Sequence, residues 1–248
     1  MTGDQMTGGT AAGGTATGGK PARDVEASED FDEIADILTD AFRDTPVTSW
    51  MVPHGLPQRE RYITGFMHAW VRFMVHHEGT ALISPDRDAV VVWEPSERAP
   101  LTAEDHEAFR ADIIAATGPV AERCLTLMDL VDAHYPPGLP PHIHGALAAV
   151  RPGTTNRGAF LSLAVATLKH IHPRGLGVYC EGTSETSTAL WERLGAKPIG
   201  PKIRVPQSDI ALTPLFIHPD DIARHPAVSM LLSAPTAPTA PPTSTTGT

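Results

Sequence analysis

The sequence predicts an α/β fold, with one central, mixed, twisted sheet flanked by helices in a single domain. Short apolar runs of strand length alternate with longer segments in which apolar residues recur at helical spacing. Between residues 148 and 196, a strand, a glycine-containing turn, a helix, a second strand and a second helix follow one another. No internal repeat is present, so these elements belong to one core.

The first expected elements are a short strand over residues 23–27 and two helices. Ser28, followed by two acids, predicts the N-terminal cap of the first helix. Pro46 ends this helix, since the residue before a proline is pushed out of the α region. Residues 57–77 predict a second helix with large apolar side chains on one broad face, namely Ile63, Phe66, Met67, Trp70, Phe73 and Met74.

A hairpin and a pair of helices come next. Residues 80–84 and 89–93 are apolar runs separated by the turn residues 85–88, which predicts two antiparallel strands. Residues 101–116 and 119–134 predict a helical insertion, and its second helix opens with proline at the first position.

The remaining elements alternate between strands and helices. A proline-rich segment before residue 142 ends the insertion. The apolar runs and helical spacings beyond it predict strands over 142–150 and 176–180, helices over 161–170 and 185–194, and closing strands over 199–205 and 211–217.

Both ends of the chain have the composition of disordered tails. Residues 1–22 are mostly Gly, Thr and Ala, with neither the basic start nor the apolar centre of a secretory signal. Residues after 233 repeat Ala, Pro and Thr, which cannot bury enough apolar surface to offset the entropy of ordering. We expect a folded domain over 23–220, followed by a short segment and a tail over 221–248.

Composition narrows the function classes. No apolar run approaches the length of about eighteen residues that a membrane span needs, so we expect a cytoplasmic protein without a membrane partner. Cys124 and Cys180 are the only cysteines, and we expect two buried, reduced thiols. The net charge of −10 disfavours nucleic-acid binding unless a local basic patch overrides it. The candidates for such a patch are Arg151, Arg157, Lys169 and Arg174.

Several motifs occur in an order that is typical of one superfamily. They are Ala41-Phe42 followed by Thr45-Pro46 and Trp50; Val90 to Trp93 before a helical insertion; His134-Tyr135-Pro136; Val150-Arg151-Pro152; Arg157-Gly158; and Glu181 ten residues before Trp191 to Gly195. With these motifs, residues 25–216 resemble the GNAT superfamily of N-acyltransferases. The layout is most similar to the puromycin N-acetyltransferase branch.

The resemblance implies a binding site for acetyl-CoA or another acyl-CoA. In that superfamily the strand carrying Val150 splays from its neighbour, and Ala148 and Val150 would pair with the pantetheine arm. The backbone from Arg157 through Gly158 and Ala159 to Phe160 would hold the pyrophosphate. Free amides and the positive end of a helix favour a diphosphate without a lysine.

The sequence departs from the family pattern at three positions. Phe160 stands where the backbone should approach a phosphate closely, which is a steric problem. Trp191 replaces a tyrosine that protonates the departing thiolate in many members, and an indole N–H can donate only a hydrogen bond. Ser187 stands where an asparagine is frequent.

Three functions therefore remain open. The first is transfer of an acyl group from a CoA thioester to the amine of a small molecule, in natural-product biosynthesis or self-resistance. In the second the donor is an aminoacyl-tRNA, whose leaving group is a ribose hydroxyl. The third is a catalytically inactive protein of the same fold that binds a small molecule. We expect a monomer or a homodimer.

Amine acylation needs a group that removes a proton. Glu181, at the end of a strand opposite the Val150 strand, is the first candidate for a catalytic base, followed by His134 and His144. Trp191, in place of the family tyrosine, is the remaining expected catalytic residue. The residues expected to contact the substrate are Trp50, Phe66, Trp70, Trp93 and His144. An alternating pair, His142 and His144, can point two imidazoles the same way, but no Cys or Asp lies nearby at metal spacing, so we expect no metal site.

Overall fold

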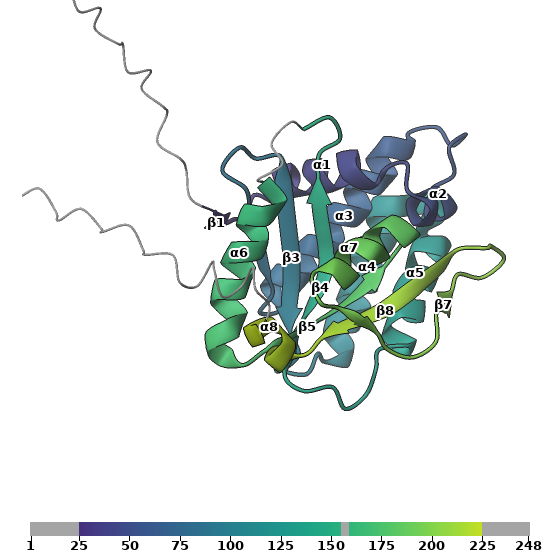
Figure 1. Ribbon diagram of the computed structural model, residues 1–248. Helices are drawn as coiled ribbons and strands as arrows, with labels where there is room; N and C mark the ends of the chain where they lie inside the picture. Colours follow the sequence, from purple (N-terminus) through teal and green to yellow (C-terminus); the bar gives the residue numbers. More distant parts are fainter. Residues whose placement is uncertain (1–24, 155–158, 225–248) are drawn as a thin grey trace, which may run out of the picture.

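An eight-stranded sheet runs through the middle of the molecule in the computed structural model, which describes residues 25–154 and 159–224 (Figure 1). The strand order is β1-β2-β3-β4-β5-β8-β6, with β7 paired to β8. Neighbouring strands are antiparallel except for β4 and β5, which are parallel. The strands are β1 (Glu26–Ala27), β2 (Thr80–Ile83), β3 (Ala89–Pro95), β4 (His142–Val150), β5 (Gly177–Gly182), β6 (Lys197–Pro198), β7 (Ile203–Arg204) and β8 (Ala211–Ile217).

Helices cover both faces of the sheet and create two cores (Figure 1). The helices behind the sheet in this view are α1 (Phe31–Phe42), α2 (Pro46–Met51), α3 (Arg59–His76), α4 (Ala103–Thr117) and α5 (Ala121–Ala133). Those in front are α6 (Ala159–Ile171), α7 (Glu185–Arg193) and α8 (Pro219–Arg224). The predicted α/β class, with α4 and α5 as the helical insertion, is confirmed.

Strand β3 shows why an uninterrupted apolar run forms a central strand. Val90 and Val92 point into the core beneath α1 and α3, whereas Ala89, Val91 and Trp93 point into the core beneath α6. Because successive side chains point to opposite faces, a strand buried on both sides needs apolar residues at every position.

The N-terminal elements differ from expectation at their ends. The cap of α1 is Asp30 rather than Ser28, and its side chain accepts a hydrogen bond from the backbone of Glu33. The sequence did not predict α2, although Thr45 caps it and Pro46 is its first residue, which is a favourable start. Pro119 lies in a 3-10 turn, Gly118–Val120, that joins α4 to α5.

Among the C-terminal elements, β8 has the predicted bounds, one predicted strand is broken into two, and one helix is added. The strand expected over residues 199–205 is replaced by the two-residue strands β6 and β7. Helix α8 ends four residues beyond the expected limit at residue 220, and Ile222 within it is buried. Cys124 and Cys180 are both buried and free, as predicted. No helix within the described ranges is long and apolar enough to cross a membrane.

Strands β4 and β5 diverge after a short pairing. Their parallel register joins His142 to Gly177, Ile143 to Val178 and His144 to Tyr179, and it extends no further. Beyond that point β4 continues to Val150 alongside β3, while β5 continues to Gly182 alongside β8. The sheet therefore opens between β4 and β5.

A β-bulge lies at the start of this divergence. Val92 pairs with Leu147 but Glu94 pairs with His144, so Gly145 and Ala146 together oppose the single residue between Val92 and Glu94. An extra residue changes which face the following side chains point to. As a result His144 lies on the same side of the sheet as Leu147.

Gly182 fixes the position of α7 against the end of β5. A Cβ atom there would lie 2.3 Å from Oγ1 and 3.1 Å from Cα of Thr188. Because a backbone atom cannot move aside cheaply, we expect Gly182→Ala to lower the free energy of unfolding by about 1–3 kcal/mol. Urea denaturation measures this effect. Gly55→Ala is the matched control, because a Cβ at Gly55 meets nothing within 4 Å, and an equal loss in both variants would contradict the prediction.

Candidate active site

A first cavity lies where β4 and β5 diverge, and its volume is about 140 Å³. One wall is the run from His144 to Ala148 in β4, and the opposite wall comes from Glu181 at the end of β5 together with α7. Side chains from α1, α3 and α5, on the other face of the sheet, close its far end. The cavity therefore extends through the opening in the sheet.

Three titratable side chains meet at the first cavity. His144 Nε2 lies 3.0 Å from Glu181 Oε2, and His144 Nδ1 lies 3.7 Å from Glu94 Oε1. The side chains of His144 and Glu181 are only 10% and 8% exposed, respectively. The bulge in β4 places the imidazole between the two carboxylates.

These contacts determine the charges of the group. Burial by itself lowers the pKa of His144, but the charges and hydrogen bonds of Glu181 and Glu94 raise it to about 10. Burial by itself would raise the pKa of Glu181, yet His144 brings the net shift below the ordinary value. The pKa of Glu94 is lowered in the same way, against burial, by His144 and Arg98. The group is therefore an imidazolium between two carboxylates at neutral pH.

The second oxygen of Glu181 has no partner. Glu181 Oε1 is buried and makes no hydrogen bond within the part of the chain that the structure describes. Buried polar atoms are nearly always paired, and the residue that carries this unpaired oxygen lines the first cavity, so the carboxylate suits a ligand with a proton to donate. Glu181 can thus accept a proton from a molecule in the first cavity.

His142, two residues before His144, has a different role. Its Nδ1 lies 2.6 Å from the carbonyl oxygen of Pro140, which can only accept, so Nδ1 carries a proton. Burial lowers the pKa of His142, and its neutral Nε2 accepts a hydrogen bond from the hydroxyl of Tyr135 at 2.5 Å. This arrangement fixes the ring of Tyr135, which stands 5.5 Å from the ring of His144.

A second cavity, of about 550 Å³, lies between α3, the helical insertion and the end of β3. It shares Trp70, Met128, Val131 and His144 with the first cavity, so these residues separate the two spaces. Glu94 lines only the second cavity and Glu181 only the first. His144 thus joins carboxylates that belong to different cavities.

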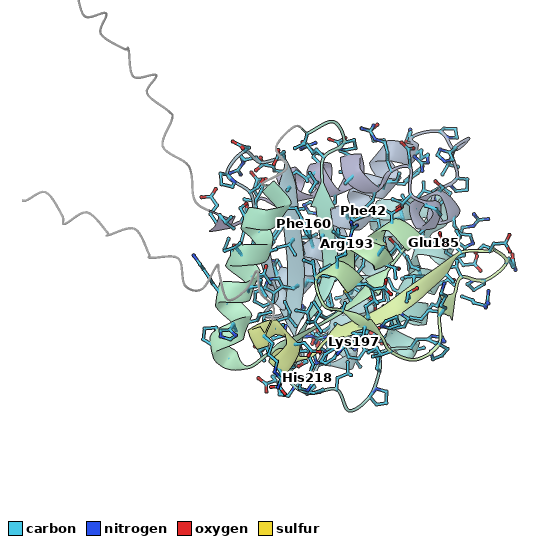
Figure 2. The ribbon with its side chains drawn as sticks, viewed as in Figure 1. Phe42, Phe160, Glu185, Arg193, Lys197 and His218 are labelled. Atoms are coloured by element: carbon cyan, nitrogen blue, oxygen red, sulfur yellow. The ribbon has the colours of Figure 1, made fainter. Side chains whose placement is uncertain are left out.

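Of the residues expected to bind the donor, Ala148 and Ser187 line the first cavity. Val150 ends β4 and packs against the core beneath α6. Ala159 is the first residue of α6 and Phe160, half-buried, is the second (Figure 2). Arg157 and Gly158 lie outside the described residues.

Ser187 and Trp191 both line the first cavity from α7. Ser187 accepts a hydrogen bond from the backbone N–H of Ser184 at 3.0 Å and forms a capping box with it, so its hydroxyl also stabilises the start of the helix. Trp191 is half-buried and packs against the core of that face.

The residues expected to contact the substrate do not all come together. Phe66 lines the first cavity, and Trp70 and His144 line both. Trp50 lines neither cavity; its backbone carbonyl accepts a hydrogen bond from Arg123, whose guanidinium lies 5.8 Å from the indole ring. Trp93 lies on the opposite face of the sheet, 2% exposed, with its ring 4.6 Å from that of His170.

His134, a predicted catalytic residue, lies away from the site. It is exposed at the end of α5, its Nδ1 is 2.8 Å from the carbonyl oxygen of Leu130, and it lines neither cavity. Sequence reasoning missed Glu94, although a carboxylate directly after a buried strand is a recognisable signal. Within the described ranges, no three His, Cys, Asp or Glu side chains are arranged to hold a metal ion.

No family model matches the sequence, and no curated protein matches it significantly. Solved structures do match the fold. A histone acetyltransferase HPA2 and related acetyltransferase from Corynebacterium glutamicum is 18% identical, with a TM-score of 0.56 over 79% of this chain and 96% of that chain. A polyamine N-acetyltransferase from Drosophila melanogaster (16% identical) and an agmatine N-acetyltransferase (15% identical) each have a TM-score of 0.52, over 79% of this chain and 100% of the other. With this likeness, the chain has the GNAT fold.

Proposed function

We propose that the protein is an N-acyltransferase that moves an acyl group from a CoA thioester to the amine of a small molecule. The observation that carries this proposal is the cavity that passes between β4 and β5, with the unpaired carboxylate oxygen of Glu181 beside it. The fold neighbours described above are named as acetyltransferases, two of them for amine substrates, which supports the same class.

The acceptor chemistry follows from the acid–base state of the site. An amine arrives as an ammonium ion and must lose a proton before its nitrogen can attack a carbonyl carbon. Glu181, ionised beside the His144 imidazolium, accepts that proton directly or through a water molecule. The C–N bond then forms, the nitrogen releases its second proton to solvent, the C–S bond breaks, and the thiolate leaves. Because Trp191 cannot protonate it, the thiolate takes a proton from solvent.

The donor would lie along the free edge of β4. Beyond His144 that edge has no partner in β5, so Ala148 and Val150 can offer backbone groups to the amides of a pantetheine arm. Helix α6 begins nine residues after β4 ends and has thirteen residues, so its positive end suits the pyrophosphate. The half-buried Phe160 packs at this end of the helix.

The charge distribution favours a CoA donor over an aminoacyl-tRNA. Arg151 forms an ion pair with Asp40, and Arg174 contacts the ring of His170, so two cations of the expected basic patch already have partners. With a net charge of −10, the chain offers weak attraction to a large polyanion. The site also contains a buried base, which a protein that only binds its ligand does not need. A role in natural-product biosynthesis or self-resistance, the puromycin N-acetyltransferase-like branch, and a monomeric or homodimeric state remain predictions.

Calorimetry with acetyl-CoA tests the donor site. We expect Ala148→Trp to weaken acetyl-CoA binding at least tenfold, because the indole would fill the opening between β4 and β5. Ala115→Trp, at an exposed position of α4, is the control and should bind like the unmodified protein. Equal affinity in both variants would place the donor elsewhere.

Ribonuclease treatment distinguishes the two donors. Under our proposal, release of CoA in the presence of an amine survives the treatment and falls less than about tenfold between low and physiological salt. Product that requires charged tRNA and is unaffected by added acetyl-CoA would overturn the proposal in favour of the aminoacyl-tRNA reaction.

A further inference from the structure

We propose that the second cavity binds the acceptor, and that this acceptor is an alkylamine with an aromatic ring that carries a carboxylate remote from the amino group, which Arg98 binds. This inference rests on the proposed acyl transfer, because it assigns the amine to the same site. It adds the substrate class, which neither the fold nor the fold neighbours specify.

The two cavities meet at His144, which contacts the candidate base Glu181. His144, Trp70 and Met128 line both cavities. A molecule in the second cavity must therefore pass these side chains to reach Glu181. A volume of about 550 Å³ lies within the range of pockets for whole small molecules, whereas about 140 Å³ suits only the reacting groups. The body of the acceptor therefore fits the second cavity and its amine the first.

Aromatic side chains form much of the second cavity. Trp70, Phe73, Phe109 and Tyr135 all line it. Phe73 and Phe109 stack on each other with their ring centroids 4.3 Å apart and their planes 22° apart, so each ring covers one face of the other. Aromatic rings pack offset or edge-on against other rings, so a lining with four of them favours an aromatic body over a linear aliphatic one.

The charges near the base are already balanced. Glu94 Oε1 lies 3.7 Å from His144 Nδ1, and Glu94 Oε2 lies 3.3 Å from Arg98 Nε. Glu94 and Glu181 thus face two cations, His144 and Arg98. Farther out, Asp129 pairs with Arg110 at 2.6 Å, while Asp132 is exposed. Asp132 also lines the cavity, but solvent screens the attraction of an exposed carboxylate for the second ammonium group of a polyamine.

Arg98 has N–H donors that no described residue uses. Its side chain is 22% exposed, and within the described ranges its one ion pair is the contact from Nε to Glu94. Its terminal nitrogens have no hydrogen-bond acceptor among the described residues, although a guanidinium presents five N–H donors in a fork that matches a carboxylate. Since Glu94 separates Arg98 from His144, a carboxylate bound here lies at the far end of the molecule from the reacting amine.

A matched set of amines tests this assignment. The probes are 4-(2-aminoethyl)benzoate, 2-phenylethylamine, which lacks only the carboxylate, and spermidine. Calorimetry measures their binding, and thiol detection of released CoA measures acyl transfer from acetyl-CoA. We expect the benzoate to bind at least tenfold more tightly than either of the others, since a charge-assisted contact is worth about this factor. We expect Arg98→Gln to abolish that difference, and Arg72→Gln to keep it, because Arg72 pairs with Asp112 and lines neither cavity.

The two readouts separate this inference from the proposed function. Equal binding of the benzoate and 2-phenylethylamine, tighter binding of spermidine, or an Arg98→Gln variant that keeps the preference would each overturn the inference. Preferential binding that depends on Arg98 supports the inference even if no CoA is released, and that absence would count against the acyl transfer instead.

Discussion

Replacing Glu181 with glutamine is expected to lower the rate of acyl transfer by about 10²- to 10⁴-fold, the usual contribution of a general base. Glutamine keeps the size of the side chain but cannot take the proton of the acceptor amine. The effect should appear in kcat/KM for the amine, measured as release of CoA. Affinity for acetyl-CoA should change little, because the proposed donor site lies against β4 and α6.

The matched control for this variant is Glu192→Gln. Glu192 belongs to the neighbouring helix α7, is exposed and lines neither cavity, so its variant should retain full activity. Circular dichroism would verify that both variants are folded. A Glu181→Gln enzyme within a few-fold of the unmodified rate would remove Glu181 as the base and direct attention to Glu94.

Replacing His144 with leucine is expected to lower the free energy of unfolding by about 3–5 kcal/mol, the cost of removing one partner from a buried ion pair. The Glu181 side chain is only 8% exposed, and the variant would leave its carboxylate without the neighbouring cation. Urea denaturation measures the loss. His134→Leu is the control, because His134 is exposed and should tolerate the change with less than about 0.5 kcal/mol.

The pH dependence of this loss has a definite sign. The pKa of His144 is raised by folding, so its stabilising contribution is complete below its ordinary value of 6.5 and disappears as pH rises through about 10. Glu181 and Glu94, whose pKa values are lowered, contribute above their ordinary value of 4.5 and lose that contribution as pH falls. The stability difference between the His134→Leu and His144→Leu variants should therefore be larger near pH ~6 than above pH ~10. A difference that grows with rising pH would contradict the charges assigned here.

The sequence predicts most elements of this fold because their signals are local. The apolar run over His142–Val150 coincides with β4, and the turn between 85 and 88 joins β2 to β3 as expected. The short strands β6 and β7 could not be bounded from the sequence, because β8 fixes their extent by pairing. Helix α2 escaped prediction because Pro46 was interpreted as the end of the preceding helix, whereas α1 already ends at Phe42 and Pro46 is the first residue of α2.

The site was less predictable than the fold, because the pairing register of the strands decides which side chains face the cavities. Trp93 was expected near the substrate, but strand alternation turns it beneath α6 while Glu94, the next residue, faces the second cavity. The bulge at Gly145 decides where His144 points. A glycine inside a strand pattern is a local signal for a bulge, but it does not show which residues of β3 the bulge opposes. Glu181 was predicted to lie opposite the Val150 strand, and the structure places it across the opening from β4.

The pairing of β4 with β5 is short for two central strands, so the sheet is weakly joined at its middle. Three residue pairs connect the β1–β4 half to the β5–β8 half, whereas β3 and β4 share a ladder from Ala89 to Pro95. A pantetheine arm lying in this gap would act as a temporary strand, supplying hydrogen bonds that the protein itself lacks. Binding of the donor would then complete the sheet, and amide hydrogen exchange along the free edge of β4 would slow when acetyl-CoA is present.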